Sequence, residues 1–262
     1  MPSSRMNRDT QGLPVRPFDT IVISDLHLGA RNARHSDLLK FLDAVETDHL
    51  ILNGDVFEDA RLRGLGPADV SVVDALRQYG EHTDLTWLVG NHDPESSWYE
   101  GLLGIPVREE VVLDVGESRY LVCHGHQWDR SLMWPKFIIT SAEYVYRGCQ
   151  IVDKSHRIAR YLKRGSKWFV RAVQSLQRRA RVAAVRRRLD GVILGHTHVV
   201  ADLDADGIHY LNSGCWTESP ASFVGIRDGE ARAYHWSAGK FAAVVAQPLR
   251  PQRRSAATLL AG

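Results

Sequence analysis

The chain has 262 residues, 44% of them hydrophobic, and this length and composition suit one α/β domain with a sizeable core. The net charge at pH 7 is only +2, and the three cysteines are far apart without Cys-x-x-Cys spacing, which argues against a disulfide framework and indicates a reducing compartment. Residues 1–17 lack the apolar core of a signal peptide, and no stretch approaches the roughly twenty apolar residues of a membrane-spanning helix. We therefore expect a cytoplasmic protein.

The first half of the chain predicts strands and helices in alternation. Short apolar runs indicate buried strands, and apolar residues at helical spacing indicate helices, the first with Ser36 as its N-cap. In chain order these elements are strand 19–24, helix 36–46, strand 49–53, helix 68–79 and strand 85–90. The β-α-β-α-β order implies a parallel sheet with right-handed crossovers.

The pattern changes after Val107. Two strands around a Gly-containing turn are expected within 110–125, and residues 134–188 are expected to be helical. Strands then resume at 191–195, 207–212, 222–227 and 231–236. This second half is expected to be more antiparallel, and the two halves could form two facing sheets. We place the domain at 18–247, with loose termini at 1–17 and 248–262.

Positive charge is concentrated in the helical segment. From Lys154 to Arg188 there are thirteen Lys or Arg and no Asp or Glu, so the rest of the chain carries +2 − 13 = −11. An apolar helical stripe runs through the same segment, at Phe169, Val173, Leu176, Ala180 and Ala183. The stripe could pack on the body with the arginines facing water, or the segment could be a cap that lies on an anionic membrane surface. Both interpretations can hold together.

Polar residues follow the ends of five expected strands. These tips read Asp25-Leu26-His27, Asn53-Gly54-Asp55, Gly90-Asn91-His92-Asp93, His124-Gly125-His126 and His196-Thr197-His198. Each tip alone fits a cap or a turn. Because binding sites in open α/β sheets form at the carboxyl ends of strands, five such tips in order predict one shared site.

The residue types at these tips indicate metal binding. Carboxylate, imidazole and amide groups without a thiolate suit Mn, Fe or Zn. They are too many for one ion, whereas two ions roughly 3.5–4 Å apart, with one bridging carboxylate, would use them all. Such a pair lowers the pKa of a bridging water and clamps the oxygens of an in-line displacement, which is the chemistry of phosphoester hydrolysis. The neighbouring glycines would let the backbone approach the metals closely; they are Gly54, Gly90, Gly125 and Gly195.

The motifs "DLH", "GDVFE", "GNHD", "HGH" and "GHTH", in this order, resemble the calcineurin-like metallophosphoesterase superfamily. The resemblance runs from Asp25 to His198. It implies a four-layer α/β/β/α sandwich, with a helical insert or cap at about 130–189 between the fourth and fifth motifs.

The resemblance also implies roles for individual residues. The first metal would be held by Asp25, His27, Asp55 and His198, and the second by Asp55, Asn91, His124 and His196, with Asp55 bridging. His92 would lie beside the scissile phosphate, where it would stabilise charge or protonate the leaving group, and Asp93 would orient it.

The helical insert, "GDVFE" and a closing "LNSGCWTES" resemble the UDP-2,3-diacylglucosamine pyrophosphatase group of lipid A synthesis. This implies an enzyme with two divalent metals, Mn²⁺ first and Fe or Zn as alternatives, peripheral on the cytoplasmic face of the inner membrane. It would split UDP-2,3-diacylglucosamine into UMP and lipid X. The residues expected to contact substrate are His126, Trp128, Asp129, Trp134, Lys163, Arg164, Ser166 and Lys167.

A hydrophobic chamber for acyl chains is a further expectation, and ordinary core packing is its alternative. The residues concerned are Trp128, Met133, Trp134, Phe137 and Ile138. Three positions depart from the group's pattern: one branch has Arg in place of His92, and Asp is common where this chain has His126 and Cys215. These departures leave the substrate open.

Other functions remain in view. A phosphatase or phosphodiesterase acting on another nucleotide or lipid would use the same motifs. A nuclease whose basic insert follows a phosphate backbone ranks lower, because aromatic residues beside Met and Ile favour acyl contact over base stacking. Nucleic acid is therefore not an expected partner. A scaffold that has lost catalysis would be expected to have lost metal ligands, yet all seven candidates are present.

Overall fold

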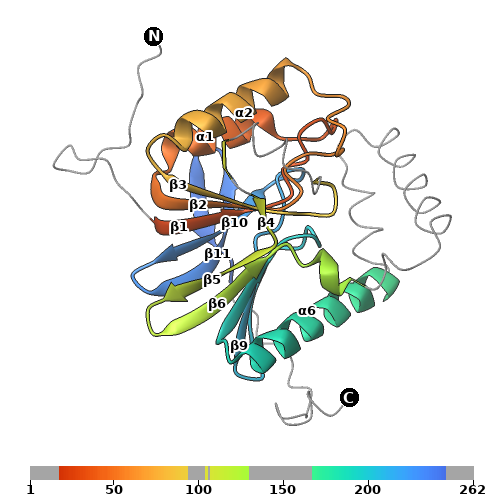
Figure 1. The fold of residues 1–262 in the computed structure, drawn as a ribbon, viewed down its shortest axis with the longest axis vertical. Helices are drawn as coiled ribbons and strands as arrows, with labels where there is room; N and C mark the ends of the chain where they lie inside the picture. The colour runs from red at the N-terminus through yellow and green to blue at the C-terminus, as the bar shows by residue number, and fades with distance from the viewer. Residues whose placement is uncertain (1–17, 94–103, 106, 130–166, 246–262) are drawn as a thin grey trace.

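The computed structural model describes residues 18–93, 104–105, 107–129 and 167–245. Four layers follow one another in Figure 1: helices α1 and α2, a first sheet, a second sheet, and helix α6. This arrangement confirms the expected α/β/β/α sandwich. The expected loose termini, and residues 130–166 of the expected insert, lie outside the described residues.

The first sheet has seven strands in the order β12-β11-β10-β1-β2-β3-β4. Strands β1, β2, β3 and β4 are parallel, whereas β10, β11 and β12 join through antiparallel pairs beside β1. The bounds are β1 Phe18–Ile23, β2 Thr47–Asn53, β3 Asp84–Leu88, β4 Val107–Arg108, β10 Ala221–Arg227, β11 Glu230–Ser237 and β12 Lys240–Ala243.

The outer face of this sheet is covered by α1 (His35–Ala44) and α2 (Pro67–Tyr79). Leu38 and Phe41 of α1 and Leu76 of α2 are buried in one cluster with the side chains of β1 and β2. The expected N-cap was wrong: α1 begins at His35, and no side chain caps it. Ser36 lies inside the first turn, two residues after the N-cap position at Arg34, too late to accept from the free N–H groups.

The second sheet has five strands in the order β5-β6-β7-β9-β8. Their bounds are β5 Glu110–Val115, β6 Ser118–Cys123, β7 Gly191–Leu194, β8 Ala201–Ala205 and β9 Ile208–Asn212. Strands β6, β7 and β9 are parallel, whereas the β5–β6, β8–β9, β10–β11 and β11–β12 pairs are antiparallel. The second half is therefore more antiparallel than the first, as expected.

Helix α6 (Lys167–Arg187) covers the outer face of the second sheet. Leu176, Ala180 and Ala184 are buried against β6, β7 and β9. Two members of the predicted stripe, Leu176 and Ala180, are thus buried, whereas Phe169, Val173 and Ala183 are half-buried. Ala184, which was not predicted, is buried beside them. A third cluster, which includes Val22, Ile51 and Ile193, fills the space between the two sheets. The three clusters correspond to the three interfaces of a four-layer sandwich.

Within the described part of the chain, no helix combines the length and the apolar character needed to cross a membrane. Cys123 and Cys215 are both free and buried. Three strands were not predicted, namely β4, β8 and β12, and neither was the short helical turn η1 (His126–Trp128).

Candidate metal centre

The predicted site residues meet where the parallel strands of both sheets end. Asp25 and His27 follow β1, Asp55 follows β2, His124 follows β6, and His196 follows β7. The loops after β1 and β2 run side by side, because the Asp25 N–H donates to the Gly54 carbonyl and the His27 N–H to the Asp55 carbonyl (both 3.0 Å). Residues distant in sequence therefore share one rigid surface at the edge of the sandwich.

One cluster joins Asp25, His27 and His198. Oδ1 of Asp25 lies 3.1 Å from Nε2 of His198, and the Nε2 atoms of His198 and His27 are 3.2 Å apart. One potential ligand atom from each residue falls within 4.8 Å of the other two. The three residues therefore form a candidate group for holding a metal ion, and all three were predicted as ligands of the first metal.

A second cluster joins Asp55, His124 and His196, again with ligand atoms within 4.8 Å of one another. Nε2 of His124 lies 3.3 Å from Oδ2 of Asp55. The same carboxylate oxygen is 3.8 Å from Nε2 of His27 in the first cluster. Asp55 thus stands between the two clusters, as a bridging carboxylate must.

The electrostatics of the clusters favour ionised carboxylates. Burial would raise the pKa of Asp25, but the close approach of His198, with a further contribution from His124, outweighs burial and holds that pKa at about 2. Burial opposes ionisation of Asp55 too, yet His124 and His27 hold its pKa far below the usual range. Both carboxylates are therefore charged at neutral pH and suited to hold cations.

The buried polar atoms fit a metal better than a packed core. Asp25 and His124 are fully buried, yet neither Oδ1 of Asp25 nor Nε2 of His124 makes a hydrogen bond within the described residues. A Cβ on Gly54 would lie 2.4 Å from Nδ1 of His124, and one on Gly195 would lie 2.7 Å from Oδ2 of Asp25. Glycine is therefore required at both positions, and the donor set matches a divalent cation with N and O ligands.

His92 lies beside the first cluster, with its ring centroid 5.0 Å from that of His27. Its Nδ1–H donates to the Glu58 carbonyl (2.8 Å), which leaves Nε2 for proton exchange with a substrate. The partners of Asp93 bear on its predicted role in orienting His92. The buried Asp93 carboxylate accepts from the N–H groups of Val56 (2.9 Å) and Gly90 (3.0 Å), so it fixes the loop that carries His92.

Sequence reasoning missed Glu58. Its Oε2 lies 2.8 Å from Nδ1 of His27, an ion-pair distance without the geometry of a hydrogen bond, and it clusters with His27 and His92. The signal was available in "GDVFE", where Glu58 follows Asp55 by three residues. That spacing alone does not predict whether the carboxylate of Glu58 contacts His27 or faces solvent.

The remaining predicted residues divide into two groups. Asn91 is exposed on the loop after β3, and His126, Trp128 and Asp129 are half-buried in and after η1. Lys167 begins α6, but its side chain is outside the described part. Trp134, Lys163, Arg164 and Ser166 lie outside the described residues, as do Met133, Phe137 and Ile138 of the expected acyl chamber.

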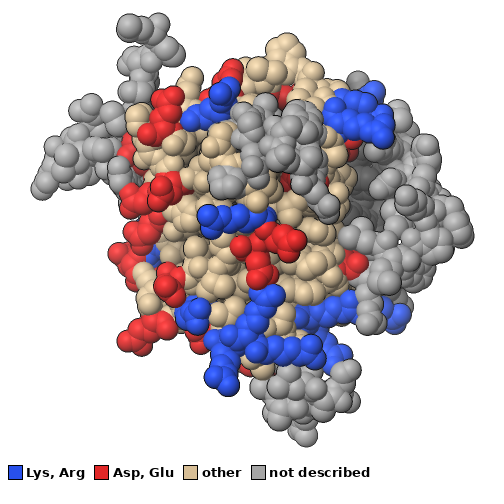
Figure 2. All heavy atoms as spheres, viewed as in Figure 1, with Lys and Arg blue, Asp and Glu red and all other residues tan. Residues whose placement is uncertain are grey.

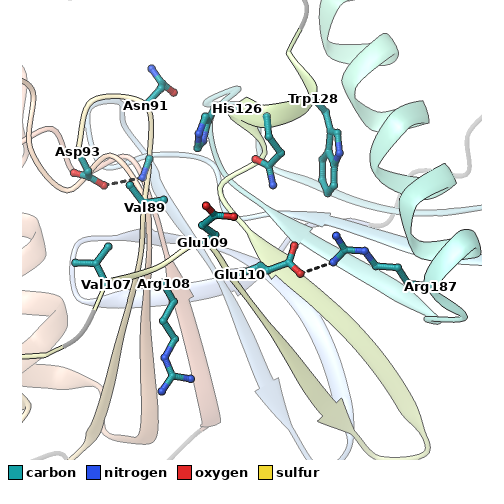
Figure 3. A pocket seen from close by; sticks show the side chains of 12 residues that line it. Val89, Asn91, Asp93, Val107, Arg108, Glu109, Glu110, His126, Trp128 and Arg187 are labelled. Atoms are coloured by element: carbon teal, nitrogen blue, oxygen red, sulfur yellow. Dashed lines mark hydrogen bonds and ion pairs between the residues drawn. The ribbon is translucent and has the colours of Figure 1, made fainter. Parts of the chain in front are cut away.

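A cavity of about 740 Å³ opens next to the clusters (Figure 3). Figure 3 shows Glu109, Glu110 and Trp128 gathered between Asn91 and Arg187, with Glu110 and Arg187 paired at 2.5 Å. The lining residues are Val89, Gly90, Asn91, Asp93, Val107, Arg108, Glu109, Glu110, His126, Gln127, Trp128 and Arg187. Most of this wall is polar, and one indole ring offers a flat apolar surface.

A comparison with protein families identifies the family of the chain. The family model described as calcineurin-like phosphoesterase matches residues 18–200, from β1 to just beyond the last histidine motif. The chain belongs to the calcineurin-like phosphoesterase family. This family binds two divalent metals, so the chain is a metal-dependent phosphoester hydrolase.

Several solved structures are similar to most of this chain at low sequence identity. A single mutant of Vps29 from Entamoeba histolytica is 20% identical with a TM-score of 0.48, and the match covers 86% of this chain and 96% of that one. YfcE, a phosphoesterase from E. coli, is 18% identical with a TM-score of 0.46, covering 81% and 90%. An archaeal phosphodiesterase is 13% identical with a TM-score of 0.46, covering 83% and 99%. The curated proteins give no match.

Proposed function

We propose that this calcineurin-like phosphoesterase cleaves the pyrophosphate bond of UDP-2,3-diacylglucosamine, releasing UMP and lipid X, with Mn²⁺ as its metal. The observation that carries the proposal is the cavity beside the metal clusters. Its volume is in the range of small-molecule sites. Its polar wall suits a nucleotide rather than an acyl chain, so the acyl chains would bind elsewhere, towards the helical insert.

The proposed metal ligands are the seven residues predicted from the motifs. Asp25, His27, Asp55 and His198 would hold the first metal, and Asp55, Asn91, His124 and His196 the second. Two bound metals would supply an activated water and stabilise the charge that develops on the phosphoryl oxygens.

The chain's own residues would complete the reaction. His92 donates from Nδ1 to the Glu58 carbonyl, so its Nε2 can stabilise the phosphate or deliver a proton to the departing oxygen. In the cavity, Trp128 offers a stacking surface, while Glu109 and Gln127 can accept hydrogen bonds from hydroxyl groups.

The test is to incubate purified protein and Mn²⁺ with UDP-2,3-diacylglucosamine and to measure UMP. The wild type should release UMP. Asp55→Ala should release none and should contain at most half as much bound metal as the wild type. Both results together would support the proposal. Absence of UMP alongside turnover of bis(p-nitrophenyl) phosphate would reject this substrate and leave another phosphatase or phosphodiesterase function. Full activity in Asp55→Ala would reject the bridging role.

A further inference from the structure

We propose that Asp129 is a positioning residue of the metal centre, which fixes the tautomer and ring orientation of His196 so that Nδ1 faces the second metal. Asp129 is not one of the seven candidate ligands, and the inference does not depend on which phosphoester is cleaved. Nε2 of His196 lies 2.8 Å from Oδ2 of Asp129, in hydrogen-bond geometry. The two side chains are only 11% and 18% exposed, so solvent competes weakly for the contact.

A neutral imidazole carries its proton on one nitrogen and binds a metal with the other. Because a carboxylate can only accept, the nitrogen of His196 that faces Asp129 must carry the proton. Nδ1 is then the atom left to bind a metal in the cluster with Asp55 and His124. Asp129 contacts Nε2 of His196 but does not belong to the cluster of Asp55, His124 and His196. The carboxylate of Asp129 and the metal would therefore lie on opposite sides of the His196 ring.

His124, in the same cluster, shows the opposite arrangement. Its Nδ1–H donates to the Asn53 carbonyl (2.8 Å), and its Nε2 faces Oδ2 of Asp55 at 3.3 Å. The two histidines of the second cluster are therefore set to use different nitrogens, each fixed by a separate acceptor.

The backbone of His196 is already held, so only its ring needs a further restraint. The His196 N–H donates to Oδ2 of Asp25 (3.0 Å), and its φ of +66° fixes the direction in which the side chain leaves the chain. Rotation about the side-chain bonds would still exchange Nδ1 and Nε2. The contact with Asp129 removes that freedom.

Asp129 is itself held in place by a rigid turn. The Asp129 N–H donates to the His126 carbonyl (2.9 Å), and the Trp128 N–H donates to the Gly125 carbonyl (3.1 Å). Nη1 of Arg179, on α6, donates to the Trp128 carbonyl (3.0 Å). A continuous chain of contacts thus runs from α6, through η1 and Asp129, to His196.

Hydrogen-bond partners of metal-binding histidines typically contribute 10–100-fold to metal affinity. Removing the carboxylate should therefore weaken one of the two metals and spare the other. Asparagine at this position keeps an oxygen that accepts from Nε2–H, so it should restore most of the affinity without the charge. A residue that acts only on folding would not show this rescue.

The experiment titrates Mn²⁺ into metal-free protein and counts bound ions by electron paramagnetic resonance. The wild type should bind two ions as a spin-coupled pair. Asp129→Ala should bind one ion normally and the other at least about tenfold more weakly, losing the coupled spectrum. Asp129→Asn should lie within about threefold of the wild type. The matched control is Asp206→Asn, which breaks an ion pair between α6 residue Arg181 and Asp206 at 2.9 Å, away from the clusters; it should bind two ions normally.

Two results would overturn the proposal. Wild-type binding of both ions by Asp129→Ala would show that His196 needs no such restraint. Equal weakening in the alanine and asparagine variants would show that the charge of Asp129 acts directly on the metal. Nitrogen-15 NMR of the Zn²⁺-loaded wild type tests the tautomer without any substitution. The imidazole of His196 should carry its proton on Nε2. A proton on Nδ1 would reject the assignment.

Discussion

At the scale of single residues, five of the seven candidate ligands share an unusual backbone conformation. Asp25, His27, Asp55, His196 and His198 all have positive φ, between +48° and +66°. Such conformations cost of order 1–3 kcal/mol each for residues other than glycine, and they persist where surrounding structure holds them. Here the loop hydrogen bonds between the ends of β1 and β2 supply part of that support. This strained backbone directs the ligand side chains, which follow different strands, towards the same clusters.

Asp93 offers a stability prediction at this scale. Its carboxylate accepts from the backbone N–H groups of Val56, Phe57 and Gly90, and burial raises its pKa to about 6, with the Asp55 charge adding to the effect. Asp93→Ala would leave these buried donors without an acceptor, at about 1–3 kcal/mol for each unpaired group. The free energy of unfolding of the metal-free protein should fall by at least about 2 kcal/mol, measured by urea denaturation.

The control for this variant is Asp43→Ala on the exposed side of α1, which should change the free energy of unfolding by less than about 0.5 kcal/mol. If Asp93→Ala were as stable as this control, the carboxylate would not be holding the two loops. A catalytic loss in Asp93→Ala would then need a direct role beside His92.

The residue scale also shows where sequence reasoning succeeds and where it stops. The positions of Asp25 and Asp55 at strand ends followed from apolar runs that stop just before them. The contact of Asp129 with His196 could not be predicted in this way. It depends on the path of η1 and on the docking of α6, and neither has a local sequence signal.

At the scale of elements, the ends of the strands must come very close together, and Gly54 marks one such close approach. Its φ is +83°, and a Cβ there would lie 2.4 Å from Nδ1 of His124. Gly54→Ala should displace His124 from the Asn53 carbonyl. We expect it to weaken Mn²⁺ binding, measured by titration of the metal-free protein, and to lower the melting temperature.

Gly207 provides a matched control in the turn between β8 and β9. Its φ of +76° is similar, but nothing lies within 4 Å of its added Cβ. Gly207→Ala carries the same kind of backbone strain without the clash, so it should lower the melting temperature and leave Mn²⁺ affinity unchanged. Equal Mn²⁺ affinities in the two variants would show that the approach to His124 does not matter for metal binding.

The elements that were missed have physical reasons. Strand β8 reads ADLDA, with acids at two of five positions, yet Asp202 is buried and accepts from the Ala233 N–H (3.1 Å). Nε2 of His209 lies 3.0 Å from its other oxygen. A paired carboxylate can occupy a strand interior, but its partners come from β9 and β11 and are invisible in the local pattern. Strand β12 is exposed throughout and therefore lacks the alternation that identifies a strand.

At the scale of the whole molecule, the pairing of β1 with β10 determines the architecture. This antiparallel contact joins segments about two hundred residues apart and lets β10, β11 and β12 extend the first sheet. The sequence predicted strands at 222–227 and 231–236, where β10 and β11 lie, but not beside which strand they would lie. The layers then follow, because each sheet needs one face against the other sheet and one against helices.

The charge distribution is also a property of the whole molecule. Figure 2 shows Lys and Arg gathered over the lower edge of this face, where α6 lies, and Asp and Glu prevailing at the left. On α6, Arg171, Arg178 and Arg186 are exposed and spaced by seven and eight residues, so they lie on one side of the helix. Leu176 and Ala180 face the second sheet from its other side. The outward side of α6 is therefore a cationic surface.

From this surface we predict salt-dependent binding to anionic membranes. Each arginine near such a membrane contributes about 1 kcal/mol, so replacing Arg171, Arg178 and Arg186 with Gln should weaken binding at least tenfold. The measurement is co-sedimentation with phosphatidylglycerol vesicles at low and high salt, because screening shortens the reach of these charges. A control with Lys40, Arg61 and Arg77 changed to Gln removes the same number of exposed charges from the opposite layer. Equal loss in both variants would assign binding to net charge rather than to α6, and unchanged binding in the α6 variant would exclude this surface.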